Sequence, residues 1–246
     1  MTSPTSLGRT PLVFLPGLLC DDRLWLQQAE ALKDIADPMI ADLTQDDSVE
    51  AMAARVLASA PPRFALAGLS MGGYVAFEIM RQQPERVTRL ALFDTSASPD
   101  TPQRAALRRA SIDSLKVGRF MGVTKRMLPQ LVHPQHVDSP VGDAVRDMAE
   151  RIGGEAFVRQ QTAVLARPDS RPTLLSIHVP TMIVVGADDL TTPLEQAQVM
   201  HEGIAGSELH VLPSCGHLPP LEQPEEATRL LRQWLQAGEA WHALAA

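Results

Sequence analysis

One short segment constrains the fold of this 246-residue chain more than any other. An apolar run, Phe64 to Ala67, leads directly into Gly68-Leu69-Ser70-Met71-Gly72, and a helical pattern begins immediately afterwards. A serine in a sharp strand-to-helix turn needs glycine two residues before and after it, because side chains there would collide with the neighbouring strand and helix. The turn also places Ser70 at a helix N-terminus, where the helix dipole favours developing negative charge. The segment therefore predicts a strand-turn-helix unit that presents Ser70 as a nucleophile.

The rest of the chain alternates short apolar runs with longer segments of helical period, which is typical of βα units that build a parallel sheet. Strands are expected at residues 12–15, 39–43, 63–69, 87–94, 181–186 and 208–212. Helices are expected at residues 22–34, 49–60, 71–83, 194–204 and 224–236. The sequence thus predicts an α/β fold with a mostly parallel sheet of about six strands, flanked by helices.

The alternation fails between residues 98 and 178, where helical patterns occur without a convincing strand. Thr101-Pro102 and Ser139-Pro140 each resemble an N-cap followed by proline at the first helical position, which predicts helices at 102–117 and 140–152. Gly153-Gly154 then interrupts the pattern before a further helix at 155–166. We expect residues 1–97 and 179–246 to form one core, and residues 98–178 to form an inserted helical cap.

Two polar residues after the last expected strands complete a catalytic constellation with Ser70. Asp189 follows the strand at 181–186, and His217 lies in the loop after the strand at 208–212. In such a triad the histidine takes the serine proton, and the carboxylate holds the imidazole tautomer. The chain order Ser, acid, His is the one found when the serine lies in this kind of turn. We predict Asp189 as the acid, ahead of Asp188, which we expect in a solvated loop, and Asp94, for which we expect a structural hydrogen bond.

Backbone N–H groups are required to stabilise the oxyanion that forms when a serine attacks a carbonyl. One should come from the residue after the nucleophile, which is Met71. The other should come from the loop after the first strand, and we predict the N–H of Leu18 there. An ordinary Pro-Gly turn at Pro16-Gly17 is the alternative interpretation.

Taken together, these residues resemble the α/β-hydrolase superfamily over nearly the whole chain. The resemblance rests on the Pro16-Gly17 loop, the turn at Ser70, the loop from Gly186 to Pro193, and Gly216-His217. It implies an eight-stranded sheet with a helical cap. Residues 17–28 are similar to the corresponding segment of carboxylesterases and 3-oxoadipate enol-lactonases, and the spacing of the acid and the histidine resembles that of capped meta-cleavage C–C hydrolases.

The sequence departs from the family pattern in two places. Pro16 stands where many relatives have histidine before the glycine of the oxyanion loop. Only about ten residues precede the first expected strand, too few for the antiparallel hairpin that opens the family sheet. We therefore expect a truncated sheet without that hairpin.

Composition excludes several other classes of protein. The net charge of −7 disfavours a nucleic-acid partner, since phosphate neutralisation needs a basic surface. No apolar run approaches the ~20 residues that span a bilayer. Two cysteines, Cys20 and Cys215, cannot form a disulfide framework, and we expect them to be reduced apolar fillers in a cytoplasmic protein. We expect this protein to be a monomer or a homodimer that acts on a small molecule. We expect it to use no metal or organic cofactor.

The insertion carries 12 Lys and Arg against 8 Asp and Glu, although the whole chain is acidic. A basic cap could bind the carboxylate of a substrate, and a solvated helix face that pairs with an acidic core is the alternative. The candidate cations are Arg104, Arg108, Arg109, Arg119, Lys125 and Arg126. Apolar residues that could line an acyl pocket, or could simply pack, are Phe120, Met121, Met127, Leu128, Leu131 and Phe157.

The sequence therefore predicts a serine hydrolase that cleaves a small carboxylic ester, lactone or thioester through an acyl-Ser70 intermediate. Two alternatives stay open. A C–C bond hydrolase of the meta-cleavage type would use the same triad. A small-molecule receptor of the hydrolase fold would keep the triad and show little turnover.

Overall fold

The computed structural model describes residues 8–118 and 120–237. Six strands form one sheet in the spatial order β2-β1-β3-β4-β5-β6, and every neighbouring pair is parallel. The strands are β1 (Thr10–Leu15), β2 (Ala36–Ile40), β3 (Phe64–Leu69), β4 (Val87–Phe93), β5 (Thr181–Gly186) and β6 (Glu208–Leu212). The predicted α/β class and the six parallel strands are confirmed for the part of the chain described.

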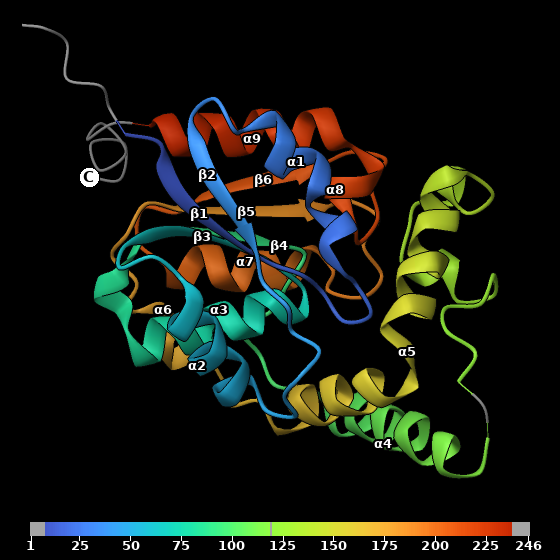
Figure 1. Ribbon diagram of the computed structural model, residues 1–246. Coiled ribbons are helices and arrows are strands. Elements are labelled where there is room, and N and C mark those ends of the chain that lie inside the picture. Colours follow the sequence, from blue (N-terminus) through green and yellow to red (C-terminus); the bar gives the residue numbers. More distant parts are fainter. Residues whose placement is uncertain (1–7, 119, 238–246) are drawn as a thin grey trace, which may run out of the picture.

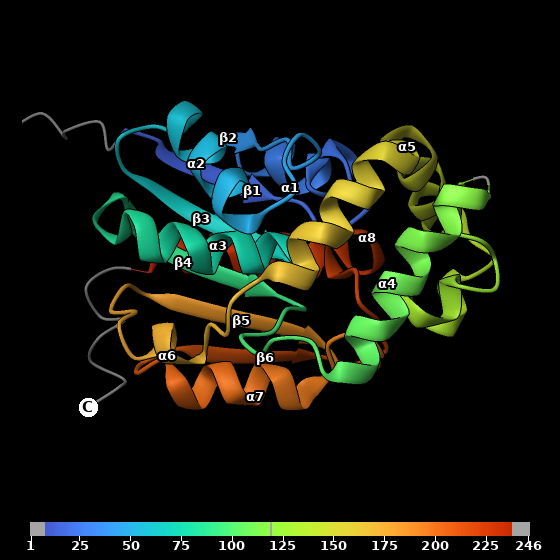
Figure 2. The ribbon, with the colours of Figure 1, turned by 90° about the horizontal axis from the view of Figure 1, so that it is seen from below.

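Helices cover both faces of the sheet (Figures 1 and 2). One face carries α1 (Leu26–Ala31), α8 (Pro219–Glu222) and α9 (Pro224–Gln236). The other carries α2 (Val49–Ser59), α3 (Met71–Gln82), α6 (Arg171–Leu174) and α7 (Leu194–Gly203). Side chains of a strand alternate between faces, so Leu12 and Phe14 of β1 join one apolar core while Val13 and Leu15 join the other. Burial on both sides explains why the central strands β3 and β5, which are buried at every position, contain no charged residue.

Two elements differ from their predicted bounds. Strand β2 begins three residues earlier than the predicted 39–43, and it tolerates Pro38 because it lies at the edge of the sheet, where the missing N–H breaks no ladder bond on the outer side. The predicted helix at 22–34 is divided at Trp25 into a 3₁₀ turn, Asp22–Leu24, and α1. The Trp25 ring stacks on Phe14 with 4.8 Å between ring centroids, and its Nε1 donates to the carbonyl of Leu15 at 3.2 Å. This tertiary contact fixes the chain where helical periodicity alone would have continued.

The segment 98–178, called the insertion below, contains α4 (Pro102–Val117) and α5 (Pro140–Ala166). Helix α5 is broken at Gly153, whose φ of 76° lies in the left-handed region, so the two helices predicted around Gly153-Gly154 are joined by a kink. Figures 1 and 2 show α4 and α5 beyond the carboxyl ends of the strands. We propose that residues 98–178 form a cap over that edge. No described helix is both long enough and apolar enough to cross a membrane.

Candidate active site

Ser70 lies in the turn between β3 and α3, at the carboxyl edge of the sheet. Its φ of 54° and ψ of −113° are sparsely populated for a non-glycine residue, which indicates a strained turn held by its surroundings. The N–H of Ser70 donates to the carbonyl of Phe93 at 3.0 Å, and Thr95 Oγ1 donates to the carbonyl of Ser70 at 2.7 Å. A Cβ on Gly68 would lie 2.6 Å from the carbonyl oxygen of Gly72, so glycine is required there.

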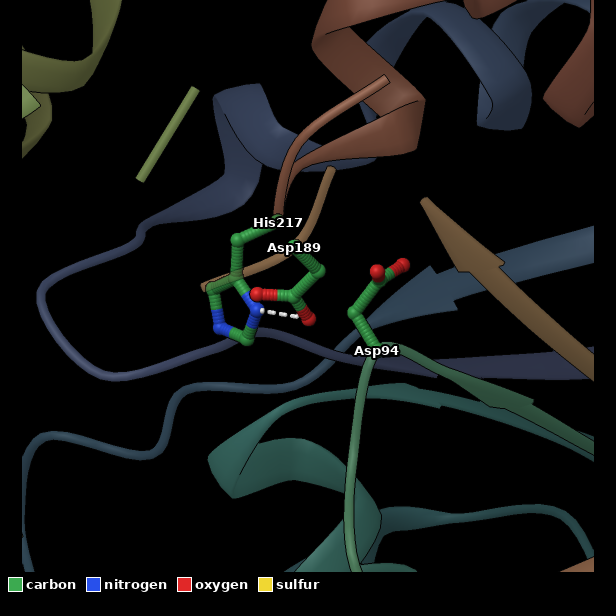
Figure 3. Close-up of side chains that lie close together, drawn as sticks. All are labelled: Asp94, Asp189 and His217. Carbon is green, nitrogen blue, oxygen red and sulfur yellow. Dashed lines mark hydrogen bonds and ion pairs between the residues drawn. The ribbon is translucent and has the colours of Figure 1, made fainter. Parts of the chain in front are cut away.

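Asp189 and His217 form a buried hydrogen-bonded pair in the loops after β5 and β6. Asp189 Oδ2 lies 2.8 Å from His217 Nδ1, a contact that Figure 3 marks with a dashed line, and both residues are less than 5 % exposed. Asp189 Oδ2 also accepts from Thr192 Oγ1 at 2.7 Å, and Oδ1 accepts from the N–H groups of Thr191 and Thr192. With Nδ1 directed at Asp189, the Nε2 atom of His217 is the one available to act as a base.

The charge on Asp189 is stabilised by these partners. Burial alone would raise the pKa of Asp189, but the charge of protonated His217 and hydrogen bonds from His217 and Thr192 hold the pKa well below its ordinary value. Asp189 therefore stays ionised at neutral pH, which the orientation of the imidazole requires.

The two alternative acids occupy different surroundings. The Asp188 side chain is 49 % exposed, and its nearest ionic partner is His133 at 3.9 Å. Asp94 is fully buried beside Asp189 and His217 (Figure 3), and its Oδ1 accepts the N–H of Gly186 at 2.8 Å. Asp94 Oδ2 has no hydrogen-bond partner among the described residues. Burial and the nearby Asp189 carboxylate raise the pKa of Asp94 well above its ordinary value, so Asp94 holds its proton more tightly than Asp189 does.

The backbone donors expected to stabilise an oxyanion are available. Met71 is the first residue of α3, where an N–H has no partner within the helix. The N–H of Leu18 has no acceptor in the described part of the chain, whereas the N–H of the next residue, Leu19, donates to Gln160 Oε1 at 3.0 Å. Leu19 has a φ of 60°, and buried Gln160 of α5 thus holds the loop in a conformation that leaves Leu18 N–H unpaired. Gln160 was not among the residues predicted from sequence.

A cavity of about 220 Å³ joins these parts. Predicted site residues that line it are Leu18, Ser70, Met71, Arg108, Met127, Leu131, Phe157 and His217. The predicted residues that do not line it are Arg104, Phe120 and Met121. Asp189 is also outside the lining, because it lies behind His217. Phe120 packs against Phe157 instead, with 5.5 Å between ring centroids, and Met121 is 72 % exposed. The further candidates Arg109, Lys125, Arg126 and Leu128 do not line the cavity, and Arg119 lies outside the described residues.

A family model described as the alpha/beta hydrolase family matches residues 12–229. The chain belongs to the α/β-hydrolase family. A pimeloyl-[acyl-carrier protein] methyl ester esterase of Neisseria meningitidis is 28 % identical over 205 residues, which cover 80 % of this chain and 78 % of that protein. A malate-bound thermophilic esterase of Thermogutta terrifontis is 29 % identical, with a TM-score of 0.81 over 92 % of this chain and 89 % of the other.

An enol-lactonase of Burkholderia xenovorans has the same fold, with a TM-score of 0.78 and 22 % identity over 93 % of this chain and 92 % of the other. The family model confirms the predicted superfamily resemblance. The chain is an α/β hydrolase.

The loop that carries His217 in this hydrolase is anchored by a buried glutamate that the sequence reasoning missed. Glu222, which is 6 % exposed, accepts the N–H groups of Gly216 at 3.0 Å and Leu218 at 2.9 Å, on either side of His217. It also accepts the N–H of His133 in the insertion at 2.7 Å. The available signal was a glutamate within one turn of the start of a short helix, where it can bond the free N–H groups.

Burial disfavours the thiolate form of both cysteines of the hydrolase. Cys20 and Cys215 are free thiols and both are buried. Burial, reinforced by Asp21, raises the pKa of Cys20 to about 12. Burial, followed by the charge of Glu222, raises the pKa of Cys215 far above its ordinary value. Both thiols stay neutral, as expected of apolar fillers.

Asp94, Asp189 and His217 bring possible metal ligands within 4.8 Å of one another. Asp189 Oδ2 and His217 Nδ1 already share a hydrogen bond, and Asp189 Oδ1 accepts two backbone N–H groups. The printed contacts of the cluster are thus those of an acid-histidine pair, with Asp94 bonded to the backbone beside it.

Proposed function

We propose that this hydrolase cleaves small carboxylic esters, lactones or thioesters through an acyl-Ser70 intermediate. The observation that carries the proposal is that Ser70 and His217 line one cavity, with Asp189 bonded to the far side of the imidazole. The unpaired N–H groups of Leu18 and Met71 belong to residues of the same lining. Nucleophile, base and oxyanion donors would then surround one reacting carbonyl.

The reaction follows from these groups. His217 Nε2 takes the proton of Ser70 as Oγ attacks the carbonyl carbon, and the charge that develops on the carbonyl oxygen is stabilised by the N–H groups of Leu18 and Met71. The imidazolium then protonates the leaving alcohol or thiol, which leaves the acyl-enzyme. Water, deprotonated by His217, attacks this ester and releases the acid and Ser70. The ionised Asp189 stabilises the imidazolium in both halves of the reaction.

The cavity supports a small substrate. Its volume of about 220 Å³ is below the ~300–1,000 Å³ typical of ligand pockets, and its lining is largely apolar. Short acyl chains fit such a space. The names of the esterase relatives, including the methyl ester esterase, favour an ester over a C–C bond as the point of cleavage.

The test is covalent labelling with a fluorophosphonate, combined with turnover of a short ester and a vinylogous diketone. Wild type should be labelled at Ser70 and should hydrolyse the ester, whereas Ser70→Ala should lose labelling and about 10⁴-fold or more in kcat. Ser59→Ala, at an exposed serine of α2, is the matched control and should match wild type in both assays. A protein that binds ligand but escapes labelling would be a receptor, and turnover of the diketone alone would indicate C–C hydrolysis.

A further inference from the structure

The wall of the cavity formed by the insertion carries a fixed positive charge. Helices α4 and α5 lie side by side (Figure 2), and each contributes a polar residue to the lining: Arg108 from α4 and Gln161 from α5. Arg108 Nε donates to Asp100 Oδ2 at 2.6 Å, and Arg108 Nη1 donates to Gln161 Oε1 at 2.7 Å. The guanidinium is thus held from two sides.

Two donors of this pair remain unused. Arg108 Nη2 and Gln161 Nε2 have no hydrogen-bond acceptor in residues 8–118 and 120–237. Gln161 is only 7 % exposed, and the Arg108 side chain is 18 % exposed. Both residues line the cavity, and neither free donor is fully buried, so both can donate to a ligand that supplies acceptor atoms.

The charges around Arg108 do not cancel. Asp100, which is buried, is contacted by three guanidinium groups: Arg108, Arg167 at 2.9 Å and Arg104 at 3.9 Å. Burial alone would raise the pKa of Asp100, but hydrogen bonds from Arg167 and Arg108 lower the pKa below its ordinary value, so Asp100 is ionised. Arg167 also lies over the ring of Tyr74, a lining residue, at 4.3 Å. One carboxylate therefore faces at least two buried or half-buried cations.

The remainder of the lining does not supply the missing negative charge. None of the described lining residues is acidic, and Arg108 is the residue among them with a permanent charge. A cavity of low polarity beside one carboxylate that is shared by several guanidinium groups keeps a net positive charge, and it attracts an anion more strongly than solvent-exposed arginines would. Arg104 and Arg109, on the same helix, do not line the cavity and offer no such site.

We propose that Arg108 and Gln161 form a subsite for a carboxylate carried by the substrate, so that the preferred esters are anionic. This proposal rests on the proposed ester hydrolysis at Ser70 and names its substrate class. The carboxylate would accept from Arg108 Nη2 and Gln161 Nε2, while the ester carbonyl lies against Ser70. A half-ester of a short dicarboxylic acid has both groups.

The experiment compares the 4-nitrophenyl half-ester of glutaric acid with its methyl-capped, neutral analogue. Wild type should favour the anionic ester by about 10- to 100-fold in kcat/KM, mainly through KM. Arg108→Gln should bring this ratio close to one, Arg108→Lys should keep part of it, and Arg109→Gln should keep all of it. Equal kcat/KM for the two esters in wild type, or an unchanged ratio in Arg108→Gln, would overturn the subsite and leave Arg108 as a link between α4 and α5.

A binding measurement separates this proposal from the proposed function. Monomethyl glutarate and dimethyl glutarate are titrated calorimetrically into the Ser70→Ala variant, in which no acyl-enzyme can form. Tighter binding of the monoester by about tenfold or more supports the subsite even if wild type hydrolyses neither nitrophenyl ester, an outcome that would contradict only the proposed hydrolysis. Equal binding of the two compounds would contradict the subsite even where Ser70-dependent hydrolysis is observed.

Discussion

The two walls of the cavity are held in different ways. Behind the wall formed by the loops after β3, β5 and β6, Asp189 holds His217 and is itself fixed in part by backbone groups, the N–H groups of Thr191 and Thr192. On the wall formed by the insertion, Arg108 is fixed by other side chains, including Gln161, which lies 53 positions further along the chain. The first kind of support survives most substitutions, because backbone N–H groups do not depend on residue type.

The walls meet through contacts to backbone groups. Gln160 of α5 holds the N–H of Leu19, Glu222 holds the N–H of His133, and the N–H of His217 donates to the carbonyl of Leu131 at 3.1 Å. The difference between the walls suggests a division of labour in which chemistry depends on the backbone of the core and selectivity depends on a few side chains of the insertion. The following predictions test that division in order of decreasing effect.

Asp189→Asn tests the catalytic wall most severely. The amide cannot stabilise the imidazolium, and its NH₂ group would face His217 Nδ1 and favour the wrong tautomer, so kcat should fall by about 10³- to 10⁴-fold. Asp188→Asn, one residue away but half exposed, should change kcat by less than about threefold. Steady-state kinetics on one ester measures both variants, and similar losses would mean that the acid has been assigned to the wrong residue.

Glu222→Gln tests the junction of the two walls. The glutamine side chain has one acceptor oxygen in place of two, and its NH₂ group would face a backbone N–H that Glu222 now accepts. We therefore expect the free energy of unfolding to fall by ~2 kcal/mol. Because two of these bonds flank His217, kcat should also fall about tenfold while KM changes little. Glu225→Gln, at an exposed position of α9, is the control for the loss of charge. A variant of reduced stability with undiminished kcat would show that Glu222 does not position His217.

Asp94→Asn should have the smallest effect, and it should depend on pH. The folded protein keeps the Asp94 proton at pH values where the unfolded chain, with a pKa near 3.8, has lost it. The free energy of unfolding therefore falls as pH rises above 3.8. The total loss is about 1.4 kcal/mol for each tenfold by which Asp94 binds its proton more tightly in the folded protein than in the unfolded chain. The asparagine variant lacks this loss, so its stability relative to wild type should increase between pH 4 and pH 8 in denaturant titrations. A difference that is independent of pH would mean that Asp94 is ionised in the folded state.

The sequence predicted features that depend on local pattern. The alternation of apolar runs and helical segments predicted all six strands, and the bounds of β5, β6, α4 and α9 agree with the structure. The predicted range of the edge strand β2 was three residues too late along the chain. An apolar pattern does not show that Pro38 lies within an edge strand, or that Leu43 is buried in a loop and not in a strand. Gln160 and Glu222 were missed because a polar residue in a helix gives no sign of which distant N–H group it will meet.

The sequence by itself determined that Ser70 would lie in a tight strand-to-helix turn and that Asp189 and His217 would follow later strands, because parallel strands bring their carboxyl ends to one edge of the sheet. Only the tertiary structure decided which cation of the insertion reaches the cavity. Arg104, Arg108 and Arg109 share one helix, and the packing of α4 against α5 turns Arg108 alone of the three toward the cavity. That choice depends on contacts between residues more than fifty positions apart, which no local pattern encodes.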